Sequence, residues 1–199
     1  MRYLPIVVLA AAIMAATFAP RSTSLSVPPP MLGATEVVTP DAFWALIEAA
    51  RSNGADCDSQ AATLDAQLSQ LSPEQIVQFD QEMRARLVES YRWDLWGVAY
   101  LINGGASDDG FEYFRAWLIA QGRDYFSAAL GDPERAADRA EAGEAECEAM
   151  LYVAADAYES KTGEQLPPSG VRYPAKPAGQ PPDEEDLEAR FPAVARRFN

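Results

Sequence analysis

The chain has 199 residues, 48% of them hydrophobic, which suits one domain with appendages. Its 30 Asp and Glu outnumber 16 Lys and Arg, and the net charge of -14 opposes binding to a polyanion, so we expect no nucleic-acid binding. The sequence holds no histidine, which excludes Ser/His/Asp and Cys/His nucleophilic catalysis and the usual histidine-rich zinc sites.

The N-terminal segment, residues 1–19, differs in composition from the rest of the chain. Arg2 precedes an apolar run that ends at Ala19, shorter than the ~20 residues of a membrane-spanning helix and similar to the core of a secretory signal. We therefore expect a signal or an anchor, and an exported or envelope-associated protein that contacts a membrane only through this segment. Pro20 disfavours cleavage after Ala19, so the alternative is a cytoplasmic protein that starts at Met31.

Residues 20–38 form a second N-terminal segment, rich in Ser, Pro and Thr and without hydrophobic periodicity. Such a composition is typical of a linker. The sequence therefore predicts a signal-like or anchor segment over 1–19, a linker over 20–38 and one folded domain over 39–199.

Apolar residues recur at helical spacing through the predicted domain, and capping signals mark helix starts. Thr39 and Pro40 suit the start of the first helix, and Ser72 with Gln75 forms a capping box at the clearest one. The segments with this pattern are 39–54, 59–71, 72–91, 92–102, 108–121, 123–131, a helix starting at Asp132, and 144–163. The period of the third segment continues through the fourth, with a bend expected near Gly97.

The segment 108–121 carries Phe111, Phe114 and Leu118 on one side and further aromatic residues around it, an apolar arc too wide for a surface helix. We expect it at the centre of the fold. Beyond the last of these helices runs a Pro-rich arm, "LPPSGVRYPAKPAGQPP", which must be extended because proline does not sustain a helix. Residues 183–198 then form a short C-terminal helix. The prediction is a single compact all-α multi-helix domain, without a repeat or a convincing strand.

Cys57 and Cys147 are the two cysteines of the chain. Cys147 shares a helical stripe with Leu151, Ala154 and Tyr158, where a buried thiol behaves as a small hydrophobe. We therefore predict two free thiols. One disulfide formed after export is the alternative.

The stretch "LINGGASDDGFEYFRAWLIAQG", Leu101 to Gly122, places two glycines and two aspartates before the central helix. Ser107, Asp108 and Asp109 stand where the helix begins, so we expect their side chains to cap free amides and to complement the positive end of the helix dipole. Together with Glu112 the pair could offer oxygens to Mg or Ca, and no glycine motif for phosphate is present. Because capping accounts for the Asp pair, we predict no metal and no cofactor.

Two tryptophans and an aspartate lead into this stretch from the preceding helix. Aromatic residues at this spacing usually belong to a core, and the functional alternative is a cleft lined by both indoles with the Asp pair at its base. Arg115 shares a helix face with Glu112 and Asp108 and is expected to pair with them. The candidate binding cleft comprises Trp93, Asp94, Trp96, Asp108, Asp109 and Arg115. Its chemistry suits a cationic or amphipathic ligand.

Three ordered motifs are long enough to compare with known families. They are "YRWDLWGVAYLINGGASDDGFEYFRAWLIAQGRDYFSAALGDPE", "FWALIEAAR" before it and "ECEAMLYVAADAYESKTGEQLP" after it. They resemble the bacterial domain of unknown function 4240, also found in proteins called molybdate metabolism regulators. The resemblance covers Asp41 to Phe198 and implies an all-helical domain without agreed catalytic residues. The sequence differs from the family at Ala106, where a Cys is expected, and in its N-terminal segment, which resembles an export signal.

These features favour a non-enzymatic binding or protein-interaction module with an acidic surface. Its partner would be a protein or a cationic or amphipathic ligand, for which the acidic run "EAGEAECE", residues 141–148, is a further docking candidate. The alternative is a carboxylate enzyme at the turn and helix start from Gly104 to Arg115, with Asp108 or Asp109 as base or metal ligand and Arg115 orienting an anionic group. An open cleft beside Asp109 would favour the enzyme, and carboxylates bonded to backbone amides would favour the module.

Overall fold

The computed structural model describes residues 32–33, 36–54 and 56–198. The predicted signal or anchor over 1–19 and most of the predicted linker lie outside these residues. Among the described helices, none has the length and hydropathy that crossing a bilayer requires.

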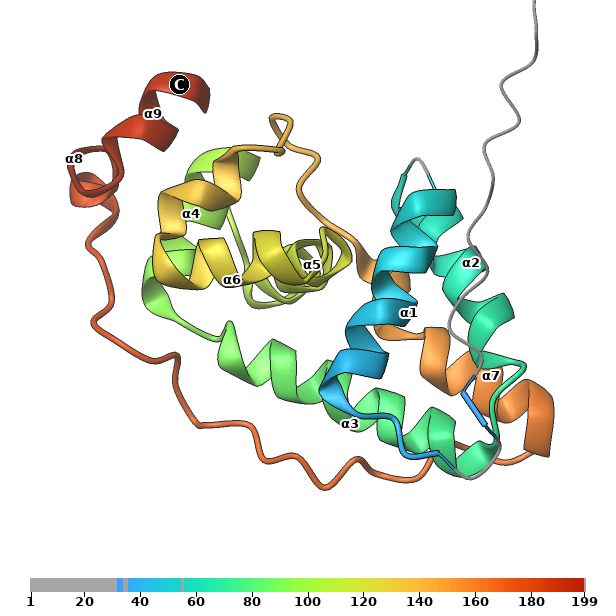
Figure 1. The fold of residues 1–199 in the computed structure, drawn as a ribbon. Coiled ribbons are helices and arrows are strands. Elements are labelled where there is room, and N and C mark those ends of the chain that lie inside the picture. The colour runs from blue at the N-terminus through green and yellow to red at the C-terminus, as the bar shows by residue number, and fades with distance from the viewer. Residues whose placement is uncertain (1–31, 34–35, 55, 199) are drawn as a thin grey trace, which may run out of the picture.

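The described part of the chain is all-α, as predicted (Figure 1). It contains nine α-helices and three short 3-10 helices, and its one β-type pairing is an isolated bridge between Arg92 and Ala178. The elements are α1 (Pro40–Asn53), α2 (Cys57–Leu68), α3 (Pro73–Glu89), α4 (Trp93–Asn103), α5 (Asp108–Ala120), α6 (Arg123–Gly131), η1 (Pro133–Ala137), η2 (Glu148–Leu151), α7 (Val153–Thr162), η3 (Glu184–Asp186), α8 (Leu187–Arg190) and α9 (Pro192–Phe198).

The predicted helix starts are confirmed where a capping residue marks them. Thr39 accepts a hydrogen bond from Ala42 N at 3.2 Å at the start of α1. Ser72 and Gln75 form the reciprocal capping box of α3, in which Ser72 N donates to Gln75 Oε1 at 2.9 Å and Gln75 N donates to Ser72 Oγ at 3.3 Å. Val38, the residue before the predicted domain, is buried against the core.

Helix α5 is the centre of the fold, as its wide apolar arc predicts. It contacts α1, α2, α3, α4, α6 and η2, and Figure 1 shows it enclosed by these elements. Phe111, Phe114, Leu118 and Ile119 are fully buried in it. Burying four large apolar side chains on one helix contributes roughly 6–12 kcal/mol of hydrophobic stabilisation, so α5 organises the core.

The predicted continuous helix across 72–102 is interrupted between α3 and α4. Ser90 Oγ donates to Arg86 O at 2.8 Å at the end of α3, and Arg92 adopts an extended conformation that places its backbone in the bridge to Ala178. Gly97 lies inside α4, where a Cβ would come within 2.7 Å of Leu187 Cδ2. Gly97 therefore permits the close approach of α8 to α4, a role different from the predicted bend.

The predicted helix over 144–163 is shorter in the structure. Residues 144–147 form a loop because Asn103 pairs with both backbone groups of Ala145: its side chain donates to Ala145 O at 3.3 Å and accepts from Ala145 N at 3.2 Å. Cys147 N donates to Tyr113 O at 3.0 Å. These bonds draw the segment toward the end of α4 and the middle of α5, and the regular helix α7 starts only at Val153.

Cys57 and Cys147 form a disulfide, with Cα atoms 5.4 Å apart. The prediction of two free thiols is therefore wrong. It rested on placing Cys147 on a helical stripe with Leu151, whereas Cys147 precedes η2 in the extended loop and faces the first turn of α2. The contact between α2 and η2 brings the two sulfur atoms together.

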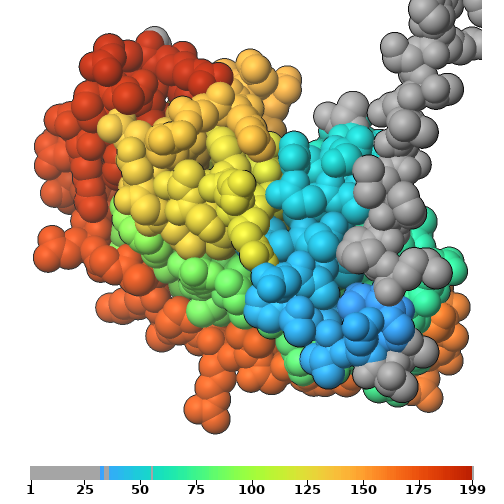
Figure 2. Space-filling model, in the orientation of Figure 1, coloured from blue at the N-terminus to red at the C-terminus, as the bar shows by residue number. Residues whose placement is uncertain are grey.

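The Pro-rich arm, residues 166–182, is extended as predicted and runs outside α3 from α7 back toward α4 (Figure 1). Figure 2 shows it along the lower edge of the molecule. Near its C-terminal end it is attached by two main-chain hydrogen bonds, from Trp93 N to Ala178 O at 3.0 Å and from Ala178 N to Tyr91 O at 2.9 Å. The single predicted C-terminal helix is divided into η3, α8 and α9, of which α8 and α9 pack on α4.

Candidate functional site

The first turn of α5 contains the predicted cap, but only one of the three expected residues forms it. Ser107 Oγ accepts a hydrogen bond from Gly110 N at 3.1 Å. Asp108 and Asp109 are exposed, and within the described residues neither side chain has a hydrogen-bond partner. Capping therefore explains Ser107 and leaves both carboxylates available to solvent or a ligand.

The aromatic residues of α4 form a stack that reaches α5. The Trp96 ring lies 4.7 Å from the Phe111 ring and 5.1 Å from the Trp93 ring, nearly parallel to both. Trp96 Nε1 donates to Ala106 O at 2.9 Å, as expected for a buried indole nitrogen. The stack thus fixes the loop before α5 and separates two hollows on the surface.

The first of these, the tryptophan hollow, has a volume of about 230 Å³. It is lined chiefly by Trp93, Trp96, Tyr100, Pro182 and Leu187. Its walls therefore come from α4 on one side and from the end of the Pro-rich arm and α8 on the other.

The second, the arginine hollow, has a volume of about 340 Å³. It is lined by Tyr91, Asp108, Asp109, Glu112, Arg115 and Tyr173. Three carboxylates surround it, and the guanidinium of Arg115 forms its inner end. Burial raises the pKa of Tyr173, partly offset by the nearby positive charge of Arg115.

Arg115 is only 3% exposed and does not pair with Glu112 or Asp108, so that prediction is wrong. Its Nε donates to Phe111 O at 3.2 Å and its Nη1 to Leu87 O at 2.7 Å. The guanidinium also lies 4.9 Å from the ring centre of Tyr91. The positive charge of Arg115 is therefore balanced by Leu87 O at the negative end of α3 and by the face of the Tyr91 ring, and not by the carboxylate that we expected.

The six predicted cleft residues therefore divide between separate places. Trp93 and Trp96 line the tryptophan hollow, whereas Asp108, Asp109 and Arg115 line the arginine hollow. Asp94 lines neither: its carboxylate pairs with Arg92 at 2.5 Å and accepts a hydrogen bond from Leu95 N at 2.8 Å. The structure brings the Asp pair together with Arg115 in one hollow and places both indoles in the other.

A third hollow, the tyrosine hollow, has a volume of about 470 Å³ and is lined by Tyr113 of α5 together with Cys57, Asp58, Glu146, Glu148, Ala149 and Tyr152. Tyr113 and Tyr152 both donate to Glu148 Oε1, at 3.1 and 3.0 Å. The hydrogen bond to this carboxylate raises the pKa of Tyr113 to about 12, with further contributions that include the charge of Asp109. The same bond raises the pKa of Tyr152.

Sequence reasoning missed the tyrosine hollow. Tyr113 belongs to the apolar arc of the central helix, and its partner Glu148 is separated from it by 35 positions. The acidic run 141–148 is the one sequence signal for this region. It predicts a charged surface but does not indicate which residues lie opposite it.

Six carboxylates border the arginine and tyrosine hollows, and we refer to them together as the acidic face. They are Asp58, Asp108, Asp109, Glu112, Glu146 and Glu148. None of them is in an ion pair with Lys or Arg of the described residues. In that part of the chain no three acidic or cysteine side chains are grouped as metal ligands, and the absence of a metal or cofactor stays a prediction.

A family model described as protein of unknown function, DUF4240, matches residues 38–160. The chain belongs to the DUF4240 family. The match confirms the resemblance seen in the motifs, and it contains α5 and the whole acidic face. The Pro-rich arm, α8 and α9 follow the DUF4240 match. No curated protein and no solved structure matches the chain.

Proposed function

We propose that the protein is a non-enzymatic interaction module whose acidic face binds a cationic segment of a partner protein. The observation that supports this most directly is the group of six carboxylates without an ion-pair partner among the described Lys and Arg residues. Like charges gathered on one surface repel one another, and a partner that brings Lys or Arg relieves this repulsion.

Aromatic rings beside the carboxylates add to the affinity for a cation. Tyr113 and Tyr152 flank Glu148 in the tyrosine hollow, and Tyr91 and Tyr173 border the arginine hollow. Ring faces attract ammonium and guanidinium groups. The net charge of -14 also raises the rate at which a basic partner encounters the protein.

A carboxylate enzyme with its site in the Gly104 to Arg115 turn and helix start is the second candidate. One observation favours it, since the arginine hollow lies open beside Asp109 and the Asp pair is not bonded to backbone amides. We prefer the binding module for two reasons. Both aspartates are exposed, whereas burial is what tunes a carboxylate for general-base catalysis. Arg115 directs Nε and Nη1 to backbone carbonyls.

We also propose that the protein acts outside the cytoplasm, as its N-terminal segment suggests. The disulfide between Cys57 and Cys147 supports this, because such bonds persist in oxidising compartments. A partner would then be another envelope or extracytoplasmic protein.

Binding of an octalysine peptide, followed by fluorescence anisotropy, tests the proposed function. The triple variant Asp109→Asn, Glu112→Gln, Glu146→Gln should bind about tenfold more weakly than the parent, because three exposed charge contacts are lost. The matched control, Glu164→Gln, Asp183→Asn, Glu185→Gln, removes the same charge outside the acidic face and should change affinity less than about threefold. Equal weakening of both variants would mean that net charge alone attracts the peptide, which contradicts a site at the acidic face.

A further inference from the structure

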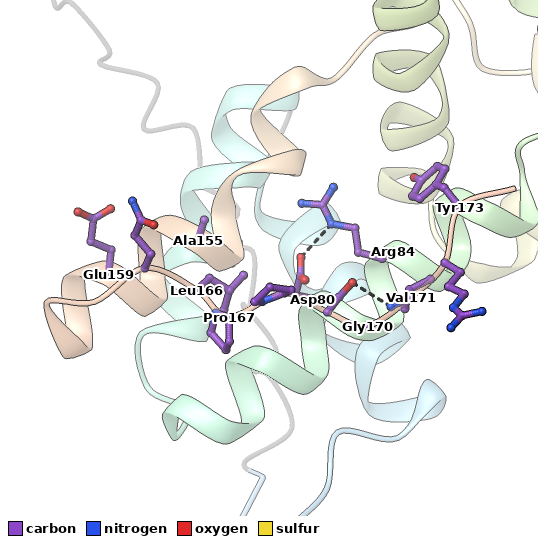
Figure 3. A pocket seen from close by; sticks show the side chains of 13 residues that line it. Asp80, Arg84, Ala155, Glu159, Leu166, Pro167, Gly170, Val171 and Tyr173 are labelled. Carbon is purple, nitrogen blue, oxygen red and sulfur yellow. Dashed lines mark hydrogen bonds and ion pairs between the residues drawn. The ribbon is translucent and has the colours of Figure 1, made fainter. Parts of the chain in front are cut away.

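A further hollow, with a volume of about 840 Å³, lies between α3, α7 and the Pro-rich arm (Figure 3). Asp80 and Arg84 of α3 form its floor, and Glu159 of α7 and Tyr173 of the arm lie toward its opposite ends. We refer to it as the arm hollow. The residues that build it come partly from the DUF4240 match and partly from the chain beyond it.

The floor of the arm hollow contains a charge pair in which Asp80 is buried and Arg84 is partly exposed. Asp80 is 5% exposed, and its Oδ1 accepts a hydrogen bond from Arg84 Nε at 3.1 Å. Within the described residues, Asp80 Oδ2 and both Nη groups of Arg84 form no further hydrogen bond. Asp80 Oδ2 has no donor in the described residues and is not fully enclosed by protein, so it can receive an N–H group from a ligand in the arm hollow.

The arm contributes backbone groups to the opposite wall. Between residues 165 and 173 the one main-chain N–H with a partner in the described structure is that of Val171, which donates to Ser169 Oγ at 3.2 Å. Pro167 and Pro168 have no N–H, and the other main-chain amides and carbonyls of this range form no hydrogen bond with any described residue. An extended backbone with free groups can pair with the peptide groups of a ligand.

The charges around the arm hollow are balanced, in contrast to the acidic face. Asp80 and Glu159 are negative, and Arg84 and Arg172 are positive. A purely cationic ligand would meet both guanidinium groups, and a purely anionic one would meet both carboxylates. Asp80 and Arg84 lie side by side, 3.1 Å apart, and Glu159 and Arg172 add one further charge of each sign, so the lining suits a ligand that carries both signs.

We propose that the arm hollow binds a zwitterionic ligand of the amino-acid or short-peptide class. Its ammonium group would donate to Asp80, its carboxylate would accept from Arg84 and Arg172, and its peptide groups would pair with the arm. The volume lies within the range of small-molecule sites and accommodates a peptide of two or three residues. This site is independent of the acidic face, so either proposal can fail without the other.

The test is a calorimetric titration of the intact protein with trialanine, compared with N-acetyl-trialanine and trialanine amide. Trialanine should bind saturably, and each blocked peptide should bind at least about tenfold more weakly, because one charge-assisted hydrogen bond is lost. Absence of saturable binding up to about 10 mM trialanine, or equal affinity for the three peptides, would overturn the proposal.

Variants on α3 locate the binding. Asp80→Asn and Arg84→Gln should each weaken trialanine binding by about tenfold or more. Glu82→Gln is the matched control, since it breaks an i,i+4 pair with Arg86 on the same helix and should leave binding unchanged. If circular dichroism shows that Asp80→Asn is unfolded, Arg84→Gln provides the test. The Arg84 side chain is 32% exposed, so its replacement should not unfold the protein. Unaltered binding in folded Arg84→Gln would overturn the assignment.

Discussion

Tyr113 and Tyr152 share one acceptor, Glu148 Oε1, although they belong to different elements of the fold. The hydrogen bond to this carboxylate is the main reason why the pKa of Tyr113 is raised from 10.0 to about 12, and ionising the phenol would also place a negative charge against Glu148. The neutral phenol is thus favoured in the folded protein. The contribution of neutral Tyr113 to the stability of the folded protein is fully present below pH 10 and is lost as the pH rises through about 12.

Replacing Glu148 tests this relationship. Glu148→Gln removes the negative charge, so the pKa values of Tyr113 and Tyr152 should fall toward 10, measured by absorbance at alkaline pH. The transition of Tyr173 serves as an internal control, because burial raises its pKa and Glu148 is not among the causes. Unchanged titration of every tyrosine would refute the shared acceptor.

The disulfide should stabilise the fold, because it closes a loop across 90 positions. Replacing both cysteines, Cys57→Ala with Cys147→Ala, should lower the free energy of unfolding by about 2–5 kcal/mol in urea denaturation. Adding a reductant to the parent should have a similar effect, and the reductant should not affect the double variant. A parent whose unfolding is insensitive to reductant would argue against the bond.

Three substitutions in α5 and its cap should lower the free energy of unfolding by different amounts. Ser107→Ala should cost about 1 kcal/mol through loss of the cap, and Asp108→Ala about 0.3–1 kcal/mol through the helix dipole alone. Trp117→Ala should cost about 3–5 kcal/mol, because its ring is 9% exposed and packs on Phe114. Urea denaturation measures all three. An Asp108→Ala variant more stable than the parent would indicate carboxylates kept for a function and favour the enzyme alternative.

Gly97 should be intolerant of a side chain. Gly97→Ala would place a Cβ 2.7 Å from Leu187 and 2.9 Å from Phe191, so α8 must move and the free energy of unfolding should fall by about 1–3 kcal/mol. Gly131→Ala is the control, because no atom lies within 4 Å of its added Cβ and alanine favours the helix. Thermal denaturation that ranked the two variants in the opposite order would contradict the close packing of α8.

Export can be checked on the protein from its native host. Intact-mass analysis after fractionation should show either loss of the N-terminal segment or its retention in a membrane fraction, because the apolar run after Arg2 resembles a secretory signal. A soluble cytoplasmic product that begins at Met31 would contradict export and favour the alternative start.

Patterns within a few neighbouring residues, such as helix caps and apolar arcs, predict the helix starts and the central helix of this fold well. The caps at Thr39, Ser72 and Ser107 each depend on contacts within three positions, and each is found in the structure. The central place of α5 follows from its apolar arc in the same way. These features depend on backbone geometry that the local sequence determines.

Contacts between distant residues could not be predicted. Cys147 leaves the helical pattern because Asn103 holds Ala145, and helical spacing contains no information about that bond. Arg115 has acidic neighbours one turn away, yet its guanidinium turns inward to Leu87 O. The candidate cleft is divided for the same reason, since Trp96 stacks on Phe111 and lines one hollow with Trp93 while the aspartates line another.

The disulfide also divides the covalent structure into a closed ring and two open ends. Residues 57 to 147 form the ring, which contains α2 to α6, whereas the Pro-rich arm, α8 and α9 lie on an open end. A single backbone cut within the ring leaves both fragments joined through sulfur, so the oxidised protein keeps its full mass until it is reduced. A cut in the arm separates α8 and α9 from the rest of the chain as an independent peptide.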